Sequence, residues 1–74
     1  MIQILMIDLS NDEEESAVQL HRIPNKGEEL EIKATAATTA RYKILDVTHV
    51  IDHTMTTDLK KPPFSYAKIF VERT

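Results

Sequence analysis

The sequence predicts a mainly β domain in which about five antiparallel strands curl into a small, partly open barrel. Short segments rich in β-branched or alternating apolar residues recur along the chain, and turn-forming residues separate them. With 74 residues, the chain has room for one domain (residues 1–74) and too few residues for two full sheets. A single twisted sheet that curls on itself is therefore the economical way to bury apolar side chains.

Residues 1–9 form the first predicted strand. Apolar side chains occupy both of its alternating faces, as in a strand that is buried on both sides. They are Ile2, Ile4 and Met6 on one face and Leu5, Ile7 and Leu9 on the other. The isoleucine content and the short length favour a strand over a buried helix.

Residues 10–22 allow two interpretations. A serine followed three residues later by a glutamate fits a capping box, so a short helix that ends before Pro24 is one of them. The other is a strand in which Val18 and Leu20 point inward and Gln19 points outward. We favour the strand, and the acidic run before it then becomes a solvated hairpin loop.

The run Pro24-Asn25-Lys26-Gly27 is the clearest turn, and it contains the only glycine of the chain. Proline presets φ, whereas asparagine and glycine tolerate a positive φ. The following residues 29–33 alternate cleanly between charged and apolar side chains. This alternation predicts a strand with one face in water.

The stretch Tyr42–His53 is the richest predicted strand, because it is dense in β-branched and large apolar residues and lacks Gly and Pro. Its alternation breaks at two adjacent apolar pairs, Ile44-Leu45 and Val50-Ile51. Such breaks indicate a strand that bends or bulges and packs different faces along its length. We therefore expect this strand to form a corner of the barrel.

Two loops and a last strand complete the prediction. Residues 34–40, rich in Ala and Thr, are expected to form a loop or the tip of a long hairpin, and residues 54–63 form a second loop. Residues 64–73 form the closing strand. Its faces carry Phe64, Tyr66 and Phe70 on one side and Ala67, Ile69 and Val71 on the other.

Part of this pattern resembles a known family. The segment Pro24-x-x-Gly27-Glu28-x-Leu30-x-Ile32, followed by Tyr42-x-Ile44-x-Asp46-Val47-x-His49, resembles small SH3-like β-barrels. It is also similar to short, uncharacterised bacterial and phage proteins that combine a Pro-x-x-Gly-Glu turn with a Tyr-led strand. The resemblance covers about half of the chain and implies an SH3-like barrel, but it brings no catalytic or binding residue with it.

Composition narrows the classes of function. The chain has no cysteine, which excludes disulfides, a Cys-ligated zinc site and a thiol nucleophile, and which favours the cytoplasm. The apolar N-terminus lacks a basic leader and reaches Asp8 before a signal-peptide core or a membrane span is complete. The net charge of −3 disfavours a broad surface for nucleic acid.

Metal and catalytic chemistry have little support. Asp46, His49, Asp52 and His53 are the only cluster with metal-ligand chemistry. On a strand the two histidines share one face and the two aspartates share the other, so the four do not converge. The serines lack a nucleophile elbow, and one glycine is too few for a phosphate-binding loop. We therefore expect no enzyme activity, no metal site and no cofactor.

The remaining candidates are two kinds of binding. The preferred function is a non-enzymatic protein-binding or assembly module that pairs through its sheet edges with another chain, including a second copy of itself. The acidic run 12–15 is either a docking site for a basic partner or a solvated loop. The alternative function is nucleic-acid binding by basic side chains beside exposed aromatics. The candidate binding residues are Arg41, Lys43, Lys60, Lys61 and Tyr66.

Overall fold

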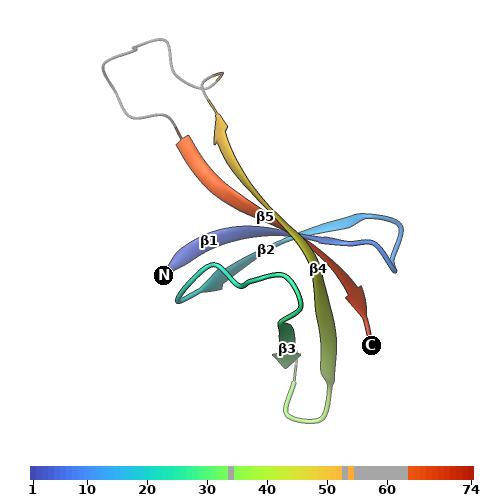
Figure 1. The fold of residues 1–74 in the computed structure, drawn as a ribbon. Helices are drawn as coiled ribbons and strands as arrows, with labels where there is room; N and C mark the ends of the chain where they lie inside the picture. The colour runs from blue at the N-terminus through green and yellow to red at the C-terminus, as the bar shows by residue number, and fades with distance from the viewer. Residues whose placement is uncertain (34, 53, 55–63) are drawn as a thin grey trace.

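The computed structural model describes residues 1–33, 35–52, 54 and 64–74, which form five β-strands (Figure 1). The strands are β1 (Ile2–Asp8), β2 (Glu14–Leu20), β3 (Glu29–Lys33), β4 (Thr39–Asp52) and β5 (Phe64–Arg73). The prediction of a mainly β domain is confirmed. The helical alternative for residues 10–22 is wrong, because most of this segment is β2. No helix long and apolar enough to cross a membrane occurs in this described part of the chain.

The strands form one curled sheet with the order β2-β1-β5-β4-β3. Three neighbouring pairs are antiparallel, but β1 and β5 run parallel. The prediction of antiparallel strands throughout is therefore wrong at the centre of the sheet. No tight turn joins β1 to β5, so no hairpin sets their direction. The long connection through β2, β3 and β4 supplies the crossover that a parallel pair requires.

The sheet curls into a half-barrel and does not close. Its edge strands are β2 and β3, and none of their Cα atoms approach each other within 8 Å. Figure 1 shows the β1–β2 hairpin and the β3–β4 hairpin extending in different directions from the middle of the sheet. The predicted partial opening is thus present, and it leaves two strand edges without a neighbour in the described chain.

The inner, concave face of the sheet holds the hydrophobic core. Strand pairing places Ile4 beside Ala67 and Met6 beside Ile69, and it brings Val47 of β4 against the same row. The buried residues of this cluster are Ile4, Met6, Ile44, Ala67, Ile69 and Val71. Half-buried side chains of β2, β3, β4 and the β2–β3 loop pack around them, including Val18, Leu20, Ile23, Leu30, Ile32 and Tyr42. The inward face predicted for residues 29–33 is confirmed, and on the last strand the face with Ala67, Ile69 and Val71 is the buried one.

The predicted bend in β4 is confirmed at one of its two positions. The register with β5 shifts between Ile44 and Asp46, so Leu45 is an extra residue in the ladder. This bulge keeps Ile44 and Val47 on the same concave face although they are three residues apart. The second break produces no register shift, and Ile51 remains 63% exposed near the end of the strand.

The β1–β2 loop turns at Asp12 and Glu13, two residues that lack the freedom of glycine to adopt a positive φ. In the β1–β2 loop, the Glu14 amide donates to the Asn11 carbonyl, and Asp12 and Glu13 both have a positive φ, as a type I′ turn requires. Residues 35–38 form the tip of a long hairpin, as one of the predictions for 34–40 stated, with Thr39 and Ala40 already inside β4. The predicted loop at 54–63 lies outside the described residues apart from Thr54.

Candidate functional site

Arg41 and Lys43, two of the predicted binding residues, lie two positions apart on β4 and point away from the core. Arg41 has one glutamate beside it on a neighbouring strand, and Lys43 has two. Arg41 is opposite Glu31, with 3.9 Å between its Nη2 and the Glu31 Oε2. Lys43 lies between Glu29 of β3 and Glu72 of β5 in the strand register. The positive charge of both side chains is therefore locally balanced.

The structure does not bring Tyr66 to this pair. Tyr66 is half-buried on β5 and lies opposite Val50, seven residues from Lys43 along β4. At about 3.3 Å per residue this separation is roughly 20 Å. Lys60 and Lys61 lie outside the described residues. The described members of the predicted set thus do not form a single patch.

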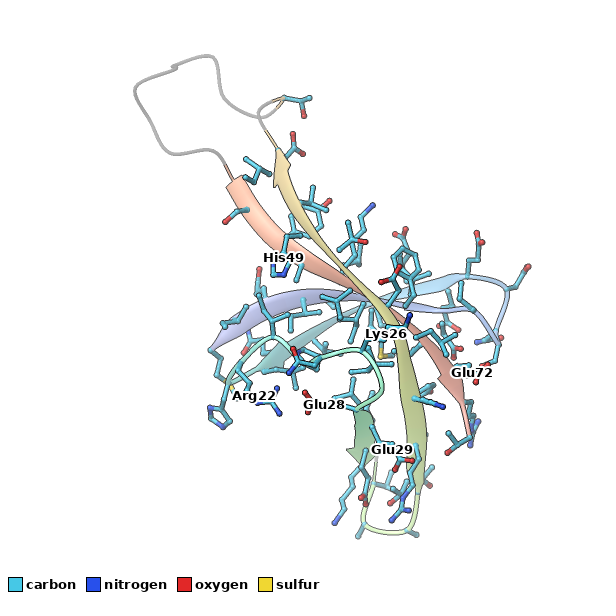
Figure 2. All side chains as sticks on the ribbon, in the orientation of Figure 1. Arg22, Lys26, Glu28, Glu29, His49 and Glu72 are labelled. Atoms are coloured by element: carbon cyan, nitrogen blue, oxygen red, sulfur yellow. The ribbon has the colours of Figure 1, made fainter. Side chains whose placement is uncertain are left out.

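The polar residues of β4 are separated as the strand pattern predicted. Asp46 and Asp52 lie opposite Phe70 and Phe64, whereas His49 lies opposite Ala67 on the concave side. His49 is exposed, and Figure 2 shows it well away from the labelled acidic side chains. In the described residues, no three His, Asp or Glu side chains gather to hold a metal ion. His53, the fourth member of the cluster, lies outside them.

A charged clamp closes the loop between β2 and β3. Arg22 donates two hydrogen bonds to the Glu28 carboxylate, at 2.9 Å from Nη1 and 2.5 Å from Nη2 (Figure 2). The backbone N–H of Asn25 donates a third, at 2.8 Å. The hydrogen bonds from Arg22 are the main reason that the pKa of Glu28 falls to about 2. Because both side chains are partly exposed, we assign this clamp a role in the shape of the loop.

The clamp holds a turn that completes one wall of the half-barrel. Gly27 has a φ of +91°, which residues with a Cβ rarely adopt, and this conformation closes the turn from Asn25 to Glu28. The Gly27 amide then donates to the Ile44 carbonyl, and the Ile44 amide donates to the Glu28 carbonyl. Pro24, inside the loop, is buried. The turn predicted at residues 24–27 is therefore present, and it fastens the β2–β3 connection to β4.

A second polar cluster joins the β1–β2 loop to the C-terminal end of β5. Asp8 is buried, and its Oδ1 accepts hydrogen bonds from the amide and the hydroxyl of Ser10, at 3.0 and 2.6 Å. The Ser10 hydroxyl oxygen in turn accepts from the Arg73 amide at 3.0 Å. The Leu9 amide donates to the Val71 carbonyl. These hydrogen bonds connect the residues at the end of β1 to the end of β5, where the two strands run parallel. We therefore assign the cluster a structural role.

The remaining surface feature is the outer side of β2, which we call the β2 edge. Its residues are Glu14–Leu20, and β1 is their only neighbouring strand in the sheet. From Ser16 to Leu20 the edge has no charge, no proline and no bulge. The other edge strand, β3, has only five residues, three of them charged. Edge strands are usually protected from pairing with other chains because they are short or carry charged side chains. β2 is longer than β3, and its charged residues are confined to its first two positions.

Sequence reasoning did not select this edge as a site. The residues that now stand out, such as Ala17 and Gln19, are ordinary exposed side chains with no reactive group. The available signal was the uncharged run Ser16–Leu20 between an acidic segment and His21-Arg22. The uncharged run points to a pairing surface only because the sheet order places β2 at an edge. The local sequence does not specify that position.

Comparison of the chain with protein-family models, curated proteins and solved structures gave no match. The resemblance to SH3-like barrels is therefore still a prediction.

Proposed function

We propose that this chain is a non-enzymatic protein-binding module whose β2 edge pairs with a strand of another chain. The observation that carries the proposal is the unprotected edge from Ser16 to Leu20. Such an edge presents backbone N–H and C=O groups in a row, and an extended segment of a partner can continue the sheet along them. Alternate side chains of the partner then lie on the concave and the convex face.

The small size of the domain supports the same proposal. A chain of this length buries only about 60% of the surface that it exposes when unfolded, which leaves a narrow stability margin. The residues of β2 that point to the concave face, Ser16, Val18 and Leu20, are only half-buried in the isolated chain. A strand added beside β2 covers more of this apolar surface and stabilises the fold.

The resemblance to SH3-like barrels is consistent with this role, because domains of that type commonly bind other proteins. We also propose that the domain is an SH3-like barrel, that it acts in the cytoplasm and that it is of bacterial or phage origin. Nucleic-acid binding ranks second, since Arg41 and Lys43 lie beside glutamates and the net charge of the chain is −3.

The test begins with the selection of short random peptides that bind the full chain. Hydrogen exchange then shows which backbone amides each peptide protects. We expect protection at β2, and about tenfold weaker binding to an Ala17→Lys variant, because a lysine in the middle of an edge opposes pairing. Ala36→Lys is the matched control, since Ala36 is also exposed and lies far from β2 in the sequence. In a chain that does not dimerise through β2, protection confined to other surfaces, or equal binding to both variants, would overturn the proposal.

A further inference from the structure

We infer that the partner of the β2 edge is a second copy of this chain, bound antiparallel about a two-fold axis that passes beside Ala17. This inference rests on the proposed function, because it names the strand that occupies the same edge.

The two ends of β2 carry opposite charge. Residues 12–15, which enter the strand, are all acidic, and His21 and Arg22 follow directly after it. Arg22 keeps 65% of its side chain exposed while it holds Glu28. An antiparallel second copy places the acidic end of each strand against the basic end of the other. A parallel copy places the four acidic residues of one chain against the same four of its partner, which like-charge repulsion disfavours.

The register centred on Ala17 uses the whole strand. It pairs Glu14 with Leu20, Glu15 with Gln19 and Ser16 with Val18 of the second copy, and each of these pairs occurs twice. No two charges of the same sign are then opposite each other. The Gln19 side-chain amide also faces the Glu15 carboxylate, to which it donates a hydrogen bond. Beyond the strand ends, Asp12 and Glu13 lie opposite Arg22 and His21.

Neighbouring registers are less favourable. A two-fold axis beside Ser16 pairs Glu15 with Ala17 and Glu14 with Val18, and Asp12 and Glu13 then face Leu20 and Gln19, so no acidic residue lies opposite a basic one. An axis beside Glu15 places the two copies of that glutamate opposite each other. An axis beside Val18 moves the pairing onto His21 and Arg22, where the chain bends and β2 has already ended. Cross-strand pairs of opposite or complementary polarity contribute roughly 0.2–1 kcal/mol each, so several such pairs select one register.

The geometry of the sheet also limits the assembly to two copies. An antiparallel two-fold contact uses both β2 edges and joins the two five-stranded sheets into one. The edges that remain are the two β3 strands, Glu29–Lys33, which are short and charged. Because these edges resist further pairing, we expect a closed dimer and no growing fibre.

Cysteine substitution tests the register directly, because the chain has no cysteine of its own. Residues directly opposite each other in an antiparallel pair have Cα atoms about 4.5–5.5 Å apart, which a disulfide can span. Ala17→Cys therefore cross-links two copies in a glutathione buffer. Gln19→Cys is the matched control on the same face, since its two copies are about four residues apart along the strands and out of reach. A mixture of Glu15→Cys and Gln19→Cys chains cross-links again.

We expect Ala17→Cys to cross-link at least about ten times faster than Gln19→Cys. Sedimentation of the unmodified chain should give twice the 8.5 kDa of one copy, and Ala17→Lys should shift it to the monomer. Equal cross-linking of the two cysteine variants, a monomer at high concentration, or a dimer insensitive to Ala17→Lys would each overturn the inference.

These outcomes are separate from those of the proposed function. If the chain is monomeric but a selected peptide protects the β2 amides, the second copy is excluded and the edge-binding role is retained. If no peptide protects β2 and no dimer forms through it, both are excluded. Circular dichroism of each variant confirms that the exposed substitutions leave the fold intact.

Discussion

Glu28 lies where the loop after β2 folds back toward β4, and three hydrogen bonds converge on its carboxylate. Two come from Arg22 and one from the backbone of Asn25. Because all three favour the ionised carboxylate, the pKa of Glu28 is lowered to about 2. The ionised carboxylate of Glu28 therefore helps to hold residues 22–28, which form one wall of the half-barrel, in place.

The pH dependence of stability follows from this shift. A glutamate in the unfolded chain has a pKa of about 4.3, so the clamp contributes its full stability above that pH. As the pH falls from about 4.3 to about 2, the unfolded chain takes up a proton before the folded chain does, and the contribution is lost. We expect the melting temperature of Glu28→Gln to lie below that of the unmodified protein at pH 7.

The difference in melting temperature between Glu28→Gln and the unmodified protein should shrink steadily as the pH falls from about 4.3 to about 2. Glu13→Gln provides the matched control, because Glu13 is exposed in the β1–β2 loop and lies outside the Arg22 clamp. If Glu13→Gln lost stability with the same pH profile, or if Glu28→Gln matched the unmodified protein at every pH, the assigned role of the clamp would be wrong.

At the scale of elements, β4 connects the two parts of the half-barrel, because it pairs with β3 over its first residues and with β5 over most of its length. The bulge at Leu45 makes this double pairing compatible with one concave face. Ile44, directly before the bulge, is 0% exposed, and its backbone also bonds to the Gly27–Glu28 turn. The same strand therefore organises both the core and the loop.

Substitutions along β4 should affect stability according to how deeply each position is buried. Ile44→Val removes one methylene from a fully buried site and should lower the free energy of unfolding by about 0.5–1.5 kcal/mol. Ile51→Val makes the same chemical change on the same face at a position that is 63% exposed, and it should stay within about 0.5 kcal/mol of the unmodified protein. Urea unfolding measures both. Equal effects would contradict the burial pattern described for β4.

At the scale of the whole molecule, charge is arranged in alternating rows. Glu29, Lys43 and Glu72 lie side by side across β3, β4 and β5, and Glu31 lies opposite Arg41 (Figure 2 labels Glu29 and Glu72). Such rows stabilise strand pairing through opposite cross-strand charges. They also prevent the basic residues of β4 from forming a broad positive surface.

This arrangement predicts weak interaction with nucleic acid. A fluorescent single-stranded oligonucleotide titrated with the chain at low salt should show no saturable change in anisotropy. Phosphate binding requires several cations that release counterions together, and the described cations of β4 are balanced by glutamates. Saturable binding that weakens linearly in log salt concentration would instead favour the nucleic-acid alternative and place Arg41, Lys43, Lys60 and Lys61 at its centre.

Much of the fold was predictable because its signals are local. The alternation of Leu30 and Ile32 with charged residues identified β3 and its inward face, and the Gly27 turn was recognisable from its residue types. The final strand was predicted with the observed bounds, Phe64–Arg73. The candidate site was less predictable, since the candidate basic residues were chosen by type and the structure separates Tyr66 from Arg41 and Lys43.

The sequence by itself determined where most of the strands lie and, for β2 and β3, which side chains point inward, because a period of two is set by the backbone and read within a few residues. Only the tertiary structure decided that β1 and β5 pair in parallel, that the barrel stays half open, and that β2 is left at an edge. These features depend on which strands pair across long sequence separations. Such a choice depends on the burial of the whole core, and no single segment encodes it.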